Sequence, residues 1–192
     1  MKEEKLSLLP LKHKAGGHVA MFRLSNGPLC KAIKTNEHAF YLNVMKYEGL
    51  KPFLPRYMGL IHVVYDKGFP DIALPSDRKR LCQFQQHGQV DPPSIISIGE
   101  PFMVMEDLTL GLEKPCILDL KMGRTLSPEG FRQTIHHFLH NGPCFIPILI
   151  QHLQELYRVI NKDMVGYRFY GASLLIVLCI QMKDFFKAFL HF

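Results

Sequence analysis

The sequence predicts an α+β protein, and three observations support that prediction. The chain has 192 residues, 47% of them hydrophobic, which is enough to bury one moderate core or two small lobes. Residues 19–33 carry the pattern of a β-hairpin. Residues 127–160 carry two amphipathic helical patterns, and strand patterns lie on both sides of them. We therefore expect strands and helices in both halves of the chain.

The first half begins with the predicted hairpin, in which Ser25-Asn26-Gly27 makes a tight turn between strands at 19–23 and 29–33. Gly16-Gly17 precedes it as a turn that could also let backbone N–H groups approach a phosphate. The next helix is capped by Thr35 or Asn36 and ends at Gly49. Glu37 lies in its first turn, where the helix dipole favours a carboxylate.

An apolar strand is predicted at 61–65, after which residues 66–99 lose periodicity and indicate a loop or disordered insert. The run Arg78-Lys79-Arg80 in this insert fits a nucleic-acid contact, a nuclear address or a solvated charge cluster. Residues 102–105 form a buried strand. The polar break Glu106-Asp107-Leu108 that follows is either a strand-end turn or a hinge between two lobes.

The second half begins with a predicted strand at 115–123, whose alternation places the apolar side chains on one face and the charged pair on the other. The acid Asp119 and the base Lys121 therefore point the same way. A carboxylate that orients or deprotonates an acceptor, beside an ammonium that neutralises phosphate charge, suits phosphoryl transfer. The same pattern also fits a solvated ion pair at a strand end.

Ser127 caps the next predicted helix, with Pro128 at its first position. Its buried side is predicted to consist of Phe131, Ile135, Phe138 and Leu139, and a second helix follows with the stripe Leu149, Leu153, Leu156 and Ile160. A buried strand is predicted at 167–177. Within it, Ser173 either lines a site or lies at the edge of the core.

The charge of the chain favours anionic partners, since its net charge is +6 and its pI is about 9.1. Five scattered cysteines without a C-x-x-C pair argue against a disulfide framework or a zinc ribbon, so we expect a reducing compartment, cytosol or nucleus. The charged N-terminus lacks the apolar core of a signal peptide, and the longest apolar runs are too short to span a bilayer. We expect a soluble protein.

The spacing P-x-x-x-D-x-K-x-G at 115–123 resembles the signature of the inositol polyphosphate kinase family. The G-G-H before the hairpin and R-F-Y-x-x-S-L-L at 168–175 agree with it, and residues 123–142 resemble the hexakisphosphate kinase branch. The resemblance implies a two-lobed fold related to protein kinases. Its N-terminal lobe would span 1–106, including the insert at 66–99, and its C-terminal lobe would span 107–192.

The resemblance also implies an ATP- and Mg²⁺-dependent kinase that phosphorylates a soluble inositol polyphosphate, with inositol hexakisphosphate converted to a diphosphoinositol phosphate. Its residues would be the catalytic pair Asp119 and Lys121, the phosphate-binding Lys31 supported by Glu37, the backbone adenine contacts Glu106 and Leu108, the ribose contact Asp107, the site-lining Ser173 and the magnesium ligand Asp184. ATP and an inositol polyphosphate would be its partners. We expect no nucleic acid and no membrane insertion.

Two departures from the family pattern leave alternatives open. Lys121-Met122-Gly123 continues directly into Arg124. At this point the family carries two strands of the large lobe and a helix that contacts inositol phosphates. In addition, little sequence follows Asp184. We therefore expect a truncated C-terminal lobe, with inositol phosphate binding impaired more than ATP binding. The alternatives are a catalytically impaired relative that acts through protein contacts and a nucleic-acid binder that uses the run at 78–80.

Overall fold

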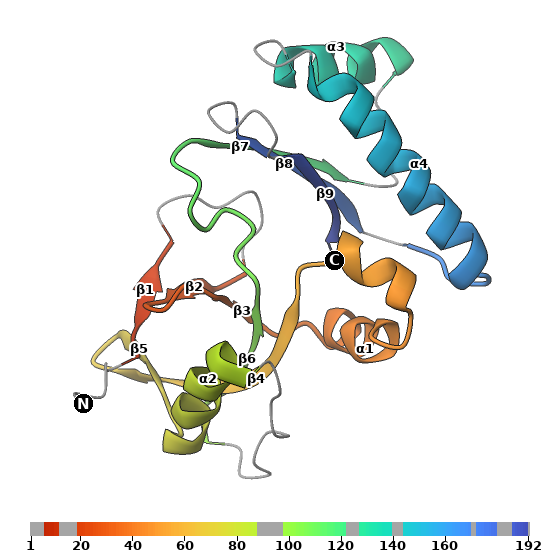
Figure 1. Cartoon of the computed structure of the whole chain (residues 1–192). Coiled ribbons are helices and arrows are strands. Elements are labelled where there is room, and N and C mark those ends of the chain that lie inside the picture. The colour runs from red at the N-terminus through yellow and green to blue at the C-terminus, as the bar shows by residue number, and fades with distance from the viewer. Residues whose placement is uncertain are drawn as a thin grey trace. The chain divides into compact units, whose positions relative to one another are not determined.

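The computed structural model of the chain describes residues 6–11, 19–87, 98–121, 127–139, 144–169, 172–179 and 186–191 (Figure 1). The chain divides into two compact units. Unit 1 consists of Met1–Asn43 and Arg56–Asp107, and unit 2 consists of Val44–Pro55 and Leu108–Phe192. The segment 44–55 therefore belongs to unit 2, although the sequence places it in the N-terminal lobe.

Unit 1 contains a six-stranded antiparallel sheet in the order β1-β2-β3-β6-β4-β5 (Figure 1). Its strands are β1 (Leu8–Pro10), β2 (Met21–Leu24), β3 (Leu29–Ala32), β4 (Tyr57–Asp66), β5 (Phe69–Ile72) and β6 (Glu100–Met105). The predicted hairpin is β2–β3. Its turn includes Gly27 at φ 118°, a left-handed conformation that glycine adopts at little cost.

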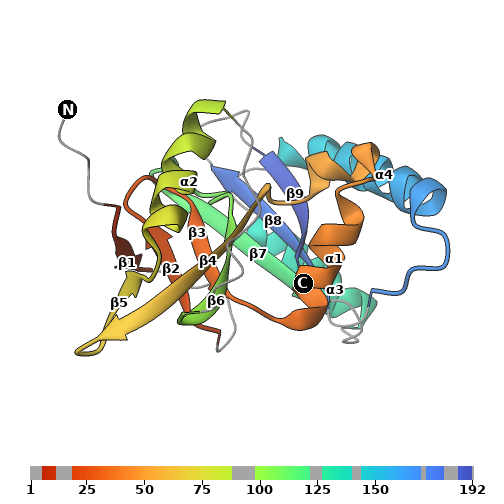
Figure 2. The same cartoon turned by 90° about the horizontal axis from the view of Figure 1, so that it is seen from below.

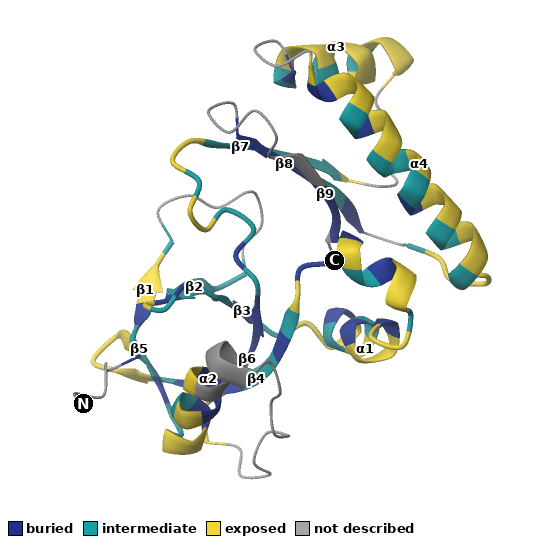
Figure 3. Cartoon of the chain, viewed as in Figure 1, coloured by how far each residue is buried: buried dark blue, intermediate teal, exposed yellow. Residues whose placement is uncertain are grey.

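One face of this sheet carries the core of the unit. Cross-strand partners point to the same side, so Phe22, Cys30 and Val104 form one row, and Ala32 and Phe102 belong to the next. These side chains pack with others from β1, β4, β5 and α2 in one apolar cluster. Figure 3 shows buried segments along β3, β4 and β6. The alternate residues of β2, β3 and β6, including Lys31, lie on the opposite face.

The segment between β4 and β6 is structured where the sequence predicts an insert at 66–99. Residues 69–72 form β5, and α2 (Pro75–His87) follows. The hydrophobic pattern of the sequence did not predict α2, because the buried side chains of this helix include the charged Asp77 and Arg80. Asp77, in the first turn of α2, accepts hydrogen bonds from the His62 backbone N–H (3.1 Å) and from Arg80 (2.9 Å).

The basic run at 78–80 is not a solvated cluster, because two of its three side chains point inward. Arg80 is 6% exposed and donates to the Leu60 carbonyl as well as to Asp77. Arg78 reaches into the structure from the same helix, whereas Lys79 is exposed. Two of these cations therefore hold α2 in place, and the structure gives no support to a nucleic-acid contact through the run.

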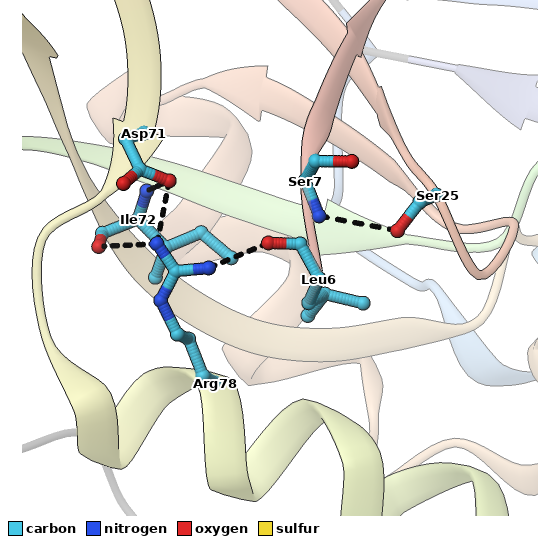
Figure 4. A network of polar contacts seen from close by, with 6 residues as sticks. All are labelled: Leu6, Ser7, Ser25, Asp71, Ile72 and Arg78. Carbon is cyan, nitrogen blue, oxygen red and sulfur yellow. Dashed lines mark hydrogen bonds and ion pairs between the residues drawn. The ribbon is translucent and has the colours of Figure 1, made fainter. Parts of the chain in front are cut away.

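Arg78 ties the two edges of the sheet together (Figure 4). Its Nη1 donates to the carbonyl of Leu6, just before β1 (2.5 Å), and its Nη2 donates to Asp71 Oδ1 (2.5 Å) and to the Ile72 carbonyl (3.3 Å) in β5. The Ser7 N–H donates to Ser25 Oγ (3.1 Å), which fixes the start of β1 to the β2–β3 turn. The strands β1 and β5 are at opposite ends of the strand order yet contact each other, so the sheet is curled. Arg78 links these two edges by hydrogen bonds to Leu6, just before β1, and to β5.

We expect Arg78→Ala to lower the free energy of unfolding by about 1–3 kcal/mol, because it removes charge-assisted hydrogen bonds to three acceptors. Urea denaturation measures this change. The matched control is Lys79→Ala, which removes an exposed charge from the same helix and should stay within about 0.5 kcal/mol of the wild type. Equal effects of the two substitutions would contradict the bridging role of Arg78.

The first helix, α1 (Thr35–Val44), ends earlier than the predicted Gly49. A 3₁₀ helix, η1 (Glu48–Phe53), follows it in unit 2 and buries Leu50 and Phe53. Gly49 lies in this second helix and approaches α4 closely, since a Cβ there would meet Asp163 Oδ2 at 3.0 Å. Its role is thus close packing rather than helix termination.

Unit 2 contains an antiparallel sheet in the order β7-β8-β9, seen side by side in Figure 2. The strands are β7 (Pro115–Lys121), β8 (Ser173–Cys179) and β9 (Phe186–His191), and the helices are α3 (Pro128–Phe138) and α4 (Phe145–Asp163). The predicted cap of α3 is confirmed, because Ser127 Oγ accepts a hydrogen bond from the Gly130 N–H (3.1 Å). No helix in the described part of the chain is both long and apolar enough to cross a membrane.

The helices of unit 2 pack against one face of the sheet. Cys116, Leu118 and Leu120 of β7 join an apolar cluster with residues of α3 and α4, as the predicted alternation requires. Two details differ from the sequence prediction. Phe131 is 48% exposed rather than buried, and β8 begins at Ser173, with residues 167–169 outside any strand.

Candidate functional site

In unit 1 the structure brings the predicted pair Lys31 and Glu37 together. Lys31 Nζ lies 2.7 Å from Glu37 Oε1, and the two side chains are 4% and 2% exposed. Lys31 comes from β3 and Glu37 from the first turn of α1. Burial raises the pKa of the Glu37 carboxyl, and the neighbouring Lys31 ammonium offsets that rise only in part. The lysine is thereby held at a fixed point on the sheet face opposite the core.

The same face carries a second ion pair that the sequence analysis missed. Arg23 Nη2 of β2 lies 2.5 Å from Asp107 Oδ2, with the Asp107 side chain 2% exposed and the Arg23 side chain 38% exposed. Asp107 was predicted, whereas Arg23 was not. The alternation of β2 could have placed Arg23 on the same sheet face as Met21. Its partner Asp107 could not be found in this way, because Asp107 lies far along the chain and comes close only through the β3–β6 pairing.

Glu106 is held in place by reciprocal bonds with Arg56. Its backbone N–H donates to the Arg56 carbonyl (2.9 Å), and its Oε2 accepts from the Arg56 N–H (3.2 Å). An adenine contact by the Glu106 backbone would therefore use its carbonyl oxygen. Leu108 is the first residue of the second segment of unit 2 and begins a turn over 108–111.

In unit 2, Asp119, Lys121 and Ser173 share one face of the sheet, opposite to the one that the helices cover. Lys121 pairs with Ser173 across β7 and β8, and Asp119 lies two residues before it in β7. Lys121 Nζ lies 4.0 Å from Asp119 Oδ2, with the two side chains 56% and 18% exposed. The exposed Lys121 ammonium can therefore meet an anion from solvent while it remains close to the Asp119 carboxylate.

One oxygen of this pair stands out chemically. Asp119 Oδ1 is buried and has no hydrogen-bond partner within the part of the chain that the structure describes. A buried carboxylate oxygen normally accepts a hydrogen bond, because leaving it without one costs free energy. The Asp119 carboxylate can thus accept a hydrogen bond or a proton from a ligand without breaking a contact of its own among those residues.

Part of the predicted site lies outside the described residues, namely the magnesium ligand Asp184 and the Gly16-Gly17 turn. Among the residues that are described, no group of three or more His, Cys, Asp or Glu side chains could hold a metal ion. Magnesium needs only one or two carboxylates when phosphate oxygens complete its coordination.

The predicted site residues that the structure describes are divided between the two units. Unit 1 contains Lys31, Glu37 and Asp107, and unit 2 contains Asp119, Lys121 and Ser173.

Comparison with known proteins finds a match to the family model described as inositol polyphosphate kinase. Two segments match it, residues 102–127 and residues 122–181. They contain the polar break after β6, the whole of β7 with Asp119 and Lys121, both helices of unit 2, and β8 with Ser173. The match thus covers the unit 2 face described above.

Curated relatives show the same likeness over a short length. An inositol polyphosphate kinase of Schizosaccharomyces pombe is 41% identical over 59 residues, which are 30% of this chain and 6% of that protein. Inositol hexakisphosphate kinase 1 of Saccharomyces cerevisiae is 37% identical over 59 residues, again 30% and 6%. Inositol hexakisphosphate kinase 3 of Homo sapiens is 47% identical over 64 residues, 31% of this chain and 15% of that protein.

The matched length is therefore a small part of each relative, between 6% and 15% of the three proteins named. The segments that match the family model include the acid and base of β7. Residues 102–181 of the chain are thus similar to the inositol polyphosphate kinase family model, and about 30% of the chain is similar to curated kinases with inositol phosphate names.

Proposed function

We propose that this chain is an ATP-dependent kinase of soluble inositol polyphosphates, with inositol hexakisphosphate as acceptor and a diphosphoinositol phosphate as product. The observation that carries the proposal is the Asp119–Lys121 pair on β7, with a buried Asp119 oxygen that has no partner among the described residues. This pair lies within the segments that match the family model. The human relative that is 47% identical over 64 residues is itself named a hexakisphosphate kinase.

In this proposal Asp119 orients the acceptor, and it takes the proton where the acceptor group carries one. Lys121 lies on the same face and remains 56% exposed, so its ammonium binds the transferring or the acceptor phosphate. A bond forms between the acceptor oxygen and the γ-phosphorus of ATP, and the bond from that phosphorus to the ADP oxygen breaks. Ser173, opposite Lys121 in the β7–β8 pairing, lines the same face.

The nucleotide is assigned to unit 1 residues and to the segment that follows β6. Lys31, braced by Glu37, binds ATP phosphates, and Asp107 contacts the ribose. The Glu106 carbonyl and the Leu108 backbone contact the adenine edge. Asp184 would hold the Mg²⁺ that accompanies ATP, and that ion would neutralise charge on the phosphates.

The sequence also suggests which ligand is held less well. The two family matches meet at residues 122–127, which include the Gly123–Arg124 junction where we expect a family segment to be absent. We infer that the chain lacks some of the contacts with inositol phosphates that this segment makes in the family. ATP binding should therefore be retained better than inositol phosphate binding.

As part of this proposal, we place the protein in the cytosol or nucleus.

Thermal-shift titration of the intact chain tests the ligand assignment. Mg-ATP should raise the melting temperature in a saturable way, and inositol hexakisphosphate should do so at higher concentration. Sulfate at matched ionic strength controls for charge screening, because the chain carries a net charge of +6. A shift with inositol hexakisphosphate that sulfate reproduces, together with no shift by Mg-ATP, would overturn the proposal.

A further inference from the structure

Arg23 occupies a defined position on the unit 1 face that carries Lys31. Met21, Lys31 and Met103 form one cross-strand row, and Arg23 lies in the next row, opposite Leu29. Rows on one face of a sheet are about 7 Å apart, since each residue of a strand advances about 3.4 Å.

Asp107 follows this second row, because it comes two residues after Met105, the partner of Leu29. The row of Arg23 therefore lies between Lys31 and Asp107 along the strand direction. The Arg23 guanidinium reaches the Asp107 carboxylate at 2.5 Å.

The two ion pairs of this face differ in exposure. The Lys31 and Glu37 side chains are both almost fully buried, at 4% and 2%. Asp107 is buried to the same degree, yet the Arg23 side chain is 38% exposed. A guanidinium carries five N–H donors in a planar fork, so it can hold a carboxylate on one edge and bind a second anion on another.

We propose that Arg23 is a nucleotide-positioning residue that acts at the junction of ribose and phosphate. Its guanidinium fixes the Asp107 carboxylate for the ribose hydroxyls, and the same side chain, 38% exposed, donates to the phosphate attached to the ribose. This inference rests on the proposed function, which assigns the ribose to Asp107 and the outer phosphates to Lys31. The order Asp107, Arg23, Lys31 along the sheet then matches the order ribose, first phosphate, outer phosphates in the nucleotide.

The test is a competition-binding series with adenosine, AMP, ADP and ATP, each in Mg²⁺, on the intact chain. In the wild type, AMP should bind about tenfold more tightly than adenosine, the size expected of a hydrogen bond to a charged group. Arg23→Met should remove that increment and leave the ratio of ATP to AMP affinity unchanged. Arg23→Lys should restore part of the increment, because it keeps the charge.

Arg132→Met is the matched control, since Arg132 is 80% exposed and pairs with Glu129 on the surface of α3. It should leave all four affinities unchanged. If Arg23→Met leaves the AMP-to-adenosine increment intact, whether or not it weakens all four ligands by a common factor, Arg23 makes no phosphate contact and the inference is wrong. If the wild type binds none of the four ligands, the proposed function itself fails, so the two failures are distinguishable.

Discussion

Glu37→Leu should lower the free energy of unfolding by about 3–5 kcal/mol, the cost of leaving one member of a buried ion pair without its partner. Glu37 Oε1 lies 2.7 Å from Lys31 Nζ, and both side chains are at most 4% exposed. Removal of the carboxylate leaves the ammonium in an environment of low dielectric constant. Chemical denaturation monitored by circular dichroism measures the change.

The double variant Lys31→Met, Glu37→Leu should recover most of that stability. Burial raises the pKa of Glu37 despite the neighbouring Lys31, which indicates that the attraction between the charges does not fully offset their desolvation. Apolar replacement of both partners should then cost little, yet it should abolish Mg-ATP binding. The surface pair Lys51–Glu48 gives the control, since Glu48 is 82% exposed and Glu48→Ala should change stability by less than about 1 kcal/mol. A double variant as unstable as Glu37→Leu would contradict this account.

Asp119→Asn should reduce phosphoryl transfer by about 10²–10⁴-fold, the usual contribution of a positioned general base. The amide has nearly the same shape as the carboxylate, so the fold and the β7–β8 pairing should remain. Turnover of radiolabelled ATP with inositol hexakisphosphate measures the effect, and the melting temperature confirms folding.

Glu113→Gln makes the same change of charge at an exposed residue of unit 2 outside any strand or helix, and it should leave turnover within about twofold, as expected for a surface site. Full activity in Asp119→Asn would remove this carboxylate from the mechanism. Loss of activity in both variants would instead point to the net charge of unit 2.

The local features were predictable from the sequence because their causes are local. The turn with Gly27, the cap by Ser127 and the alternation in β7 each depend on a few neighbouring residues. The segment at 66–99 was not predictable in this way. Its helix buries Asp77 and Arg80 against each other, and a hydrophobic pattern counts such residues as exposed.

The candidate site likewise has features that were predictable from the local sequence and features that were not. Asp119 and Lys121 share a face because a strand alternates, which the sequence shows directly. The Lys31–Glu37 contact came from the family resemblance and is present in unit 1. The Arg23–Asp107 contact joins β2 to the residue after β6, and neither alternation nor spacing could supply it. Long-range strand pairing is the information that the sequence patterns lacked.

The most direct test of the central claim is ³¹P NMR of the intact chain with ATP, Mg²⁺ and inositol hexakisphosphate. The account predicts that the γ-phosphate resonance of ATP falls at the same rate as a new diphosphate resonance on the inositol rises, and that Asp119→Asn suppresses both changes. Stable ATP, or ATP converted only to ADP and inorganic phosphate, would contradict it.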